Sequence, residues 1–217
     1  RAWNTWYHLW LAERAVHASL FHLLTREARY AALARDILTA YADAYLTYPN
    51  RDNVLGPTRP FFSTYLESIW LLQICLAANL LEHSGDMATA DVVRDRIVEP
   101  SSALIAQFDE GNSNRQVWNN VALLSSALPR RDHARAEAVV AAKSGIATHL
   151  TQALLPDGTW FEGDNYHQFA IRGLWYAVTM CETNAVPLAR EASDALQRGI
   201  AATFVTALPV FTLPSRK

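Results

Sequence analysis

The sequence has little lysine and no long apolar run. Lysine occurs only at Lys143 and Lys217, so nearly all of the positive charge is arginine. The formal net charge is -2 at pH 7, whereas a general nucleic-acid-binding protein usually carries a basic surplus. No apolar stretch reaches the roughly 20 residues of a bilayer-spanning helix. These shortages argue against a nucleic-acid-binding protein and against a membrane-spanning one.

Cysteine is also scarce. Cys75 and Cys181 each lie in an apolar helical pattern, and neither has a second cysteine or a histidine at metal-ligand spacing. We therefore expect two buried thiols, no metal and no cofactor. The glycine fingerprints of phosphate loops and dinucleotide sites are absent, and so is a Gly-x-Ser-x-Gly nucleophile elbow.

What the sequence does contain is a helical period almost everywhere. Hydrophobic residues make up 51% and charged residues 18%, which is typical of a folded core. Ile69, Leu72, Leu76 and Leu80 form one apolar stripe of helical spacing. Prolines, glycines and polar runs then divide the chain into about eight predicted helices. Their ranges are 4–25, 28–46, 62–83, 87–108 with a break near Pro100, 113–128, 132–155, 164–182 and 188–207.

Long helices joined by short breaks favour antiparallel hairpins. Several helices are apolar on more than one face, which suits an inner helix layer covered by an outer one. A stacked or ring-closed α/α array therefore fits better than a four-helix bundle. The chain starts at Arg1 with no methionine or signal peptide, and its last residues form no obvious closing element. We expect residues 1–217 to be a single helical domain, taken from a longer protein.

The first segment whose side chains could take part in binding or catalysis is 108–120. It contains five amide side chains within nine residues at a helix start. Ser113 with Gln116 forms a capping-box pattern, and Asn112 or Asn114 could be an N-cap. Capping does not explain asparagines inside the helix, which are poor helix formers. An amide cluster at a helix N-terminus could instead donate hydrogen bonds to a carboxylate. Spacing alone favours capping over function.

The second segment is 155–169, in which a Pro-Asp-Gly turn leads through aromatic residues into a helix. One interpretation is structural, with Asp164 as the N-cap and with Trp160 and Phe161 covering the core edge. The other is functional. Tyr166 and His167 are proton-transfer residues in the first helical turn, and a tryptophan such as Trp160 is a stacking platform for a sugar ring.

Together, residues 113–123 (SNRQVWNNVAL) and 157–167 (DGTWFEGDNYH) resemble the heparinase II/III-like polysaccharide lyases, a family that includes related alginate lyases. Residues 56–59 (GPTR) are similar too, and residues 208–214 resemble the point where the family's helical ring continues. The resemblance implies an incomplete α/α toroid, with a β-sandwich following residue 217. It also implies β-elimination on an anionic, uronate-containing polysaccharide, and hence a periplasmic or secreted protein.

The resemblance assigns roles to particular residues. Asn114 would neutralise the substrate carboxylate, and Tyr166 would be the catalytic acid and a candidate base. The sequence departs from the family at Arg115, where several relatives have a histidine, and it lacks the histidine that the family uses from a later segment. We therefore expect the isolated chain to be inactive. Further substrate contacts are predicted at Gln116, Arg115, Trp160, Glu162, His167, Arg59 and Asn119.

Two further predictions concern the surroundings of the site. Asn114 and Tyr166 should start two inner-layer helices and point into one cleft, because both act on the same sugar ring. Arg115 should border that cleft, and Trp160 should offer a ring face to an adjacent sugar. An anionic subsite is also predicted from charge at Arg51, Arg59, Arg115 and Arg172.

Two alternatives stay open. A toroid glycoside hydrolase needs two carboxylates flanking the bond, and Asp109 or Glu110 could pair with Glu162 or Asp164. A non-catalytic scaffold that binds a glycan or a protein is the other alternative, favoured by aromatic residues near loops at Trp3, Trp6, Trp118 and Trp160.

Overall fold

The computed structural model describes residues 2–206, and within that range the regular structure is helical. The described residues contain no strand, and a single β-bridge joins Leu154 to Trp160. The prediction of an all-α protein is confirmed. The chain divides into two compact units, Arg1–Phe108 and Asp109–Lys217, and each is described by itself. The predicted end of the last helix at Ala207 and the segment 208–214 lie outside the described residues.

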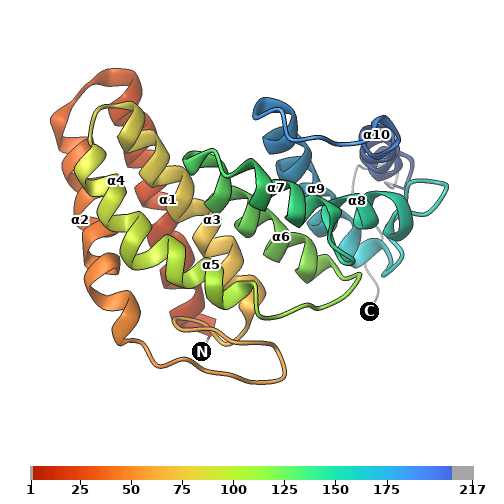
Figure 1. Cartoon of the computed structure of the whole chain (residues 1–217), viewed down its shortest axis with the longest axis horizontal. Coiled ribbons are helices and arrows are strands. Elements are labelled where there is room, and N and C mark those ends of the chain that lie inside the picture. Colours follow the sequence, from red (N-terminus) through yellow and green to blue (C-terminus); the bar gives the residue numbers. More distant parts are fainter. Residues whose placement is uncertain (1, 207–217) are drawn as a thin grey trace. The chain divides into compact units, whose positions relative to one another are not determined.

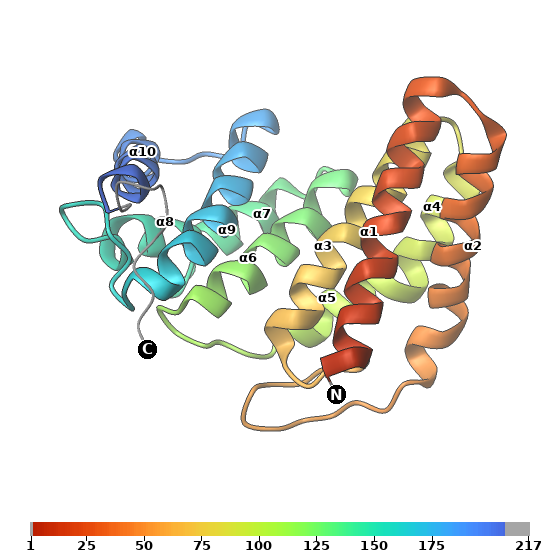
Figure 2. The same ribbon diagram turned by 180° about the vertical axis from the view of Figure 1, so that it is seen from behind.

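The first unit is built from helical hairpins. Its α-helices are α1 (Ala2–Thr25), α2 (Ala28–Ala44), α3 (Thr64–His83), α4 (Met87–Val93) and α5 (Glu99–Ile105). A 3-10 turn η1 (Tyr45–Thr47) extends α2. In Figures 1 and 2, α1 and α3 run side by side in the same direction, and α2 and α4 return beside them. The centre of this unit is aromatic, because the buried Trp70 contacts Tyr41, Tyr45 and Phe61.

The fourth predicted helix continues through Pro100 instead of breaking there. Between α4 and α5 lies a π-helical segment, η2 (Arg94–Val98), so the coil is unbroken from Met87 to Ile105. Proline lacks an amide proton and clashes with the carbonyl one turn earlier in a regular α-helix. The wider π turn just before Pro100 accommodates this misfit, and Pro100 then occupies the first turn of α5, where proline is tolerated.

The second unit contains α6 (Asn114–Ala127), α7 (His133–Ala141), α8 (Ile146–Thr148), α9 (Asp164–Thr183) and α10 (Arg190–Val205). A 3-10 turn η3 (Leu128–Arg130) follows α6, and a π-helical segment η4 (His149–Ala153) follows α8. Helices α6 and α9 pack against each other. Trp118 near the start of α6 contacts Phe169 in the second turn of α9, with ring centroids 5.2 Å apart. Because Asn114 also bonds beside the start of α9, the two helices run in the same direction.

The prediction of one continuous helix over 132–155 is wrong. The helix stops after Ala141 and restarts at Ile146, with Gly145 in an extended conformation between them. Tertiary hydrogen bonds stabilise this interruption. The Ser144 hydroxyl donates to Asp109 (3.0 Å), and the Ser144 carbonyl accepts from the side chain of Asn120 (2.7 Å). These bonds tie the break to the amide-rich segment at the start of α6.

Helix α3 is long and apolar enough to cross a membrane when judged by length and composition alone. Core helices of folded proteins pass the same test, and most of α3 is buried inside the first unit. The two cysteines are also buried, as predicted. Burial raises the pKa of the Cys181 thiol to about 11, which keeps it protonated and unreactive near neutral pH.

Candidate functional site

The two sequence segments meet at one carboxylate oxygen. The backbone nitrogen of Asn114 donates to Glu162 Oε2 (2.7 Å), and the side-chain Nδ2 of Asn114 donates to the same oxygen (2.8 Å). The indole nitrogen of Trp160 is the third donor, at 2.8 Å. Glu162 precedes α9 by two residues, so this carboxylate joins the start of α6 to the start of α9.

The start of α6 confirms the capping interpretation in part. Ser113 is the N-cap, and its hydroxyl accepts from the backbone nitrogen of Gln116 (3.1 Å). The reciprocal half of the predicted capping box is replaced by another contact. The side-chain oxygen of Gln116 accepts from the backbone nitrogen of Glu110 (2.9 Å), so it holds the preceding loop against the helix.

The amides of Gln116, Asn119 and Asn120 share one buried face of α6, as their spacing predicted. Gln116 Nε2 donates to Asn120 (3.0 Å), and Asn119 donates to Gln116 Oε1 (3.3 Å). Asn119 has no exposed surface, and Gln116 exposes only 6%. The contact with substrate predicted for Gln116 and Asn119 stays a prediction. Their hydrogen bonds are used within the protein, where they shape the loop before α6.

Arg115 lies beside Asn114 and is oriented by an acidic partner. Its Nε pairs with Glu110 Oε2 at 2.9 Å, and 38% of its side chain is exposed, against 6% for Glu110. Burial raises the pKa of Glu110, while Arg115 opposes that rise. Glu110 therefore holds the Arg115 guanidinium in place, while part of the Arg115 side chain stays open to solvent.

The second segment places its tyrosine at the surface. Tyr166 lies in the first turn of α9 and is 48% exposed, and its backbone nitrogen donates to the Gly163 carbonyl (3.0 Å). Gly163 is the N-cap, so the prediction of Asp164 in that position is wrong. Gly163 has a φ of 99°, which a residue with a β-carbon rarely adopts. The glycine thus permits the sharp turn between Glu162 and the helix.

The predicted sugar platform is buried. Trp160 is only 1% exposed, and its ring stacks on His149 with a centroid distance of 6.0 Å. His149 is itself fully buried, and burial lowers its pKa. The prediction that Trp160 offers a ring face to an adjacent sugar is therefore wrong. Its indole instead supports Glu162.

His167, for which substrate binding is predicted, has a side chain that is only 4% exposed and is bonded within the protein. Its Nδ1 accepts from the backbone nitrogen of Trp160 (3.0 Å), and its Nε2 lies 3.0 Å from the carbonyl of Gly199. A neutral ring with the proton on Nε2 satisfies both contacts. His167 therefore ties the motif loop to α10.

We expect this role to appear as pH-dependent stability. Burial lowers the pKa of His167 below its ordinary value, so its contribution is fully present above about pH 6.5 and is lost as the pH falls below that. Replacing His167 with Gln should lower the free energy of unfolding by about 1–3 kcal/mol at pH 7. The difference between the two proteins should shrink toward about pH 5. Urea unfolding at several pH values measures it, and a constant difference would contradict the assignment.

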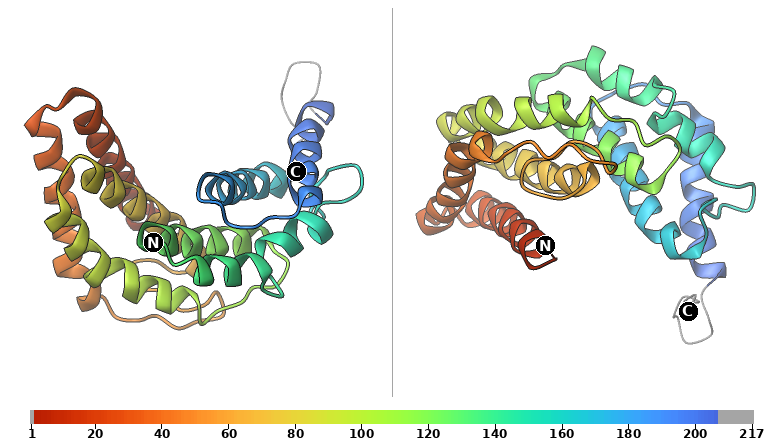
Figure 3. Two further views of the ribbon diagram at one scale, coloured as in Figure 1. Left: turned by 45° about the horizontal axis from the view of Figure 1, so that its top comes forward. Right: turned by 90° about the horizontal axis from the view of Figure 1, so that it is seen from below.

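Arg59 belongs to the first unit. Its Nη1 donates to the carbonyl of Tyr48 (2.7 Å), and its guanidinium lies 5.7 Å from the ring centroid of Tyr45. It is held in the loop between α2 and α3, which lies against the ends of α3 and α5 (Figure 3). Gly56 in that loop has a φ of +81°, and an added β-carbon would fall 2.4 Å from the ring of Phe108.

A fully buried acid organises this loop, and sequence reasoning missed it. Glu67 on α3 accepts from Thr58 Oγ1 (2.7 Å) and the backbone nitrogen of Arg59 (2.7 Å) through Oε2. Its Oε1 accepts from Tyr45 and from Ser101 (2.9 Å). One sequence feature could have predicted this role: Glu67 is an isolated acidic residue within the otherwise apolar helical pattern of residues 66–81.

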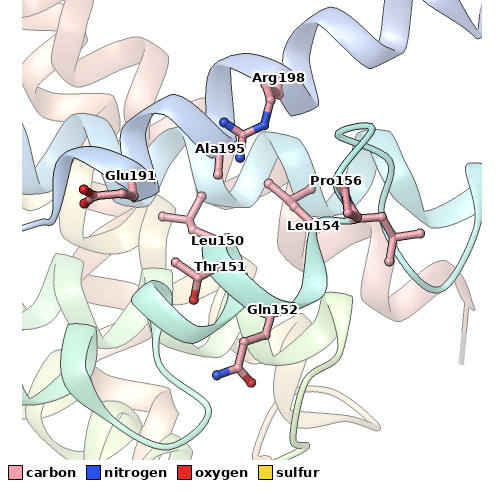
Figure 4. Close-up of a pocket in the computed structure, with 9 residues that line it drawn as sticks. Leu150, Thr151, Gln152, Leu154, Pro156, Glu191, Ala195 and Arg198 are labelled. Carbon is pink, nitrogen blue, oxygen red and sulfur yellow. The ribbon is translucent and has the colours of Figure 1, made fainter.

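A pocket of about 460 Å³ lies between η4 and α10 (Figure 4). Leu150, Leu154 and Ala195 form its apolar floor, and Glu191 and Arg198 bring charges from α10. Neither Asn114 nor Tyr166 lines it. The pocket is therefore separate from the residues that the motifs predict.

The four tryptophans that favoured a scaffold divide into two groups. Trp3 and Trp6 on α1 are 75% and 56% exposed, whereas Trp118 and Trp160 are buried. Arg172, predicted to bind anions, lies over Trp118 at 6.0 Å from the ring centroid. Within residues 2–206 no group of three His, Cys, Asp or Glu side chains is arranged to hold a metal ion.

Comparison with known proteins adds no relative to this picture. No protein-family model matches the chain, and no curated protein matches it. Function is therefore inferred from the two motifs and from the geometry around Glu162.

Proposed function

We propose that this chain is the helical catalytic part of a polysaccharide lyase that cleaves a uronate-containing glycan by β-elimination, of the heparinase II/III-like kind. The observation that carries the proposal is the bridge through Glu162. It brings Asn114 at the start of α6 beside the start of α9, where Tyr166 occupies the first turn. Capping of either helix alone requires no such meeting of the two motifs.

The reaction needs two functions that these residues can supply. The C5 proton of a uronate is weakly acidic because the neighbouring carboxylate is charged. A hydrogen bond from Asn114 Nδ2 would stabilise the charge that develops on that carboxylate, and a mostly buried donor is effective because it is held in place before the reaction. Arg115 beside it would attract the anionic chain.

Tyr166 is the proposed proton carrier. Its phenolate would take the C5 proton, the C4–C5 double bond would form, and the C4–O bond would break. The same phenol would then protonate the leaving glycosidic oxygen, so that Tyr166 returns to its starting state. Its exposed position at the start of α9 makes it accessible to a polymer.

The arrangement of the helices supports the proposed fold. In each unit, two helices run in the same direction with their hairpin partners beside them: α1 with α3, and α6 with α9. This is the repeating unit of an α/α toroid, and we propose that each unit is an arc of an incomplete one. The proposed substrate is an anionic polysaccharide, which implies a periplasmic or secreted location.

One observation favours a glycoside hydrolase as the second candidate. Glu110 and Glu162 both lie by the start of α6, and the charge of Glu162 helps to raise the pKa of Glu110. A hydrolase needs such a pair with one carboxyl protonated. However, Glu162 Oε2 accepts three hydrogen bonds and the Glu110 side chain is 6% exposed. Both acids therefore hold other groups in place, which favours the lyase.

The natural full-length protein should convert a uronate polysaccharide into products that carry a C4–C5 double bond. That bond is conjugated with the carboxylate and absorbs ultraviolet light, so absorbance should rise as chain length falls. Alginate, heparan-type and other uronate chains should be tested separately, with a neutral glycan as the control. Depolymerisation without new absorbance would contradict the proposal and favour the hydrolase.

A further inference from the structure

We propose that Glu162 is a positioning residue that fixes the side-chain amide of Asn114 in the orientation that donates to a substrate carboxylate. This inference rests on the proposed function, because it assigns a role to Glu162 within the same site. The sequence motif alone suggested substrate contact for Glu162, whereas the structure shows its oxygen turned toward protein donors.

The geometry around Glu162 Oε2 is specific. Two of its three donors, the backbone nitrogen and Nδ2, belong to the same residue, Asn114. This double contact fixes both the position of the helix start and the rotation of the amide group. The third donor, the indole of Trp160, is nearly fully buried and stacks on His149. The carboxylate is therefore anchored from its own loop while it holds α6.

The orientation of the Asn114 amide decides what an anion would meet. An amide presents either an acceptor oxygen or a donor NH₂ group, and the two are similar in size. Bonded to Glu162, Nδ2 uses one hydrogen and keeps a second hydrogen for another acceptor. If the side-chain amide of Asn114 rotated by about 180°, Oδ1 and Nδ2 would exchange positions. Oδ1 would then stand where the free hydrogen of Nδ2 had been, and it would repel a carboxylate. Glu162 excludes the turned orientation, because its oxygen accepts and cannot donate.

The same geometry predicts a difference between two substitutions at Glu162. A glutamine side chain has one oxygen and one NH₂ group. The three donors from Asn114 and Trp160 should select the orientation in which the glutamine oxygen faces them, as Oε2 of Glu162 does in the native protein. Glu162→Gln should therefore keep Asn114 in place, although the acceptor is weaker. Glu162→Ala removes the acceptor and releases the amide.

The kinetic test uses the natural full-length protein with Asn114→Ala, Glu162→Ala, the double variant and Glu162→Gln. Asn114→Ala should lower kcat by about 10²–10³-fold, as for the loss of one transition-state donor. Glu162→Ala should lower kcat by about 10²-fold, and the double variant should be no slower than Asn114→Ala, because Glu162 acts through Asn114. Glu162→Gln should recover most of the lost activity. The proposal would be overturned if the fold-loss of kcat in the double variant equalled the product of the two single losses. Full activity in Glu162→Ala would also overturn it.

A second readout separates this inference from the proposed function. In the 217-residue chain, the Asn114 side-chain NH₂ signals can be assigned by nuclear magnetic resonance, because they vanish in Asn114→Ala. One proton should be shifted downfield by its bond to Glu162, should stay downfield in Glu162→Gln, and should move to the free-amide range in Glu162→Ala. An unshifted signal in the native chain would refute the positioning role, whatever the activity. A shifted signal without any elimination by the full-length protein would refute the lyase function alone.

Discussion

Replacing Tyr166 with phenylalanine should lower the kcat of the full-length protein by about 10²–10⁴-fold, the range for loss of a positioned acid–base group. The substitution removes one oxygen from a side chain that is 48% exposed at the start of α9. The fold should tolerate this change, since the ring stays in place. KM should change little, because the proposed role of the oxygen is proton transfer. Initial rates measured by ultraviolet absorbance test this, together with the midpoint of thermal unfolding.

Tyr176 offers a matched control on the same helix. Its ring contacts Trp118 and Trp175, and these contacts do not need its hydroxyl. Tyr176→Phe removes the same atom ten residues along α9, where the side chain leaves the helix in a different direction. The control should keep native kcat. Equal losses in both variants would indicate a general effect on α9, and an unchanged Tyr166→Phe would remove Tyr166 from the mechanism.

Replacing Glu67 with alanine should reduce the free energy of unfolding by about 3–5 kcal/mol, because four donors, three of them in buried hydrogen bonds, lose a charged acceptor together. These donors come from η1, from the loop between α2 and α3, and from α5. Glu67→Gln should be less harmful, since one oxygen can still accept, but its NH₂ group then faces hydroxyl or amide donors. Urea unfolding of the 217-residue chain measures both changes.

An exposed glutamate is the control for Glu67. Glu13 on α1 pairs with its neighbour Arg14 at the surface, where ion pairs contribute little. Glu13→Ala should change stability by less than about 0.5 kcal/mol. A Glu67→Ala chain as stable as Glu13→Ala would show that the loop carrying Arg59 is held by other contacts.

The sequence predicted helix bounds well where the apolar period and the helix-ending residues indicate the same segment. Helix α3 was predicted over 62–83 and spans Thr64–His83, and α9 was predicted over 164–182 and spans Asp164–Thr183. The sequence failed where tertiary contacts override the local pattern. The pattern of the alanine-rich stretch 132–155 predicts one helix, yet two hydrogen bonds of Ser144 stabilise a break: its hydroxyl donates to Asp109, and its carbonyl accepts from Asn120. The π turn before Pro100 was equally invisible, because its period differs too little from that of an α-helix.

The sequence identified several residues of the candidate site, but it did not predict what each side chain contacts. The motifs singled out Asn114, Glu162 and Tyr166, and the structure brings the first two into contact. Burial could not be foreseen for Trp160 and His167, because aromatic and polar side chains at a helix start look alike whether they face solvent or the core. The anchoring of Arg115 by Glu110 depends on how the loop 109–113 folds back, which short-range spacing does not specify.

The most direct test of the central claim is the mass of the products formed in ¹⁸O-labelled water by the natural full-length protein. Elimination breaks the C4–O bond without adding water. Products quenched early, before the C1 hydroxyl of the new reducing end exchanges its oxygen with water, should therefore have an unsaturated end and no ¹⁸O. The expected products are unlabelled and lighter by one water than those of hydrolysis. Products that carry one ¹⁸O for each cleaved bond, with no double bond, would contradict it and assign the paired acids Glu110 and Glu162 to a hydrolase.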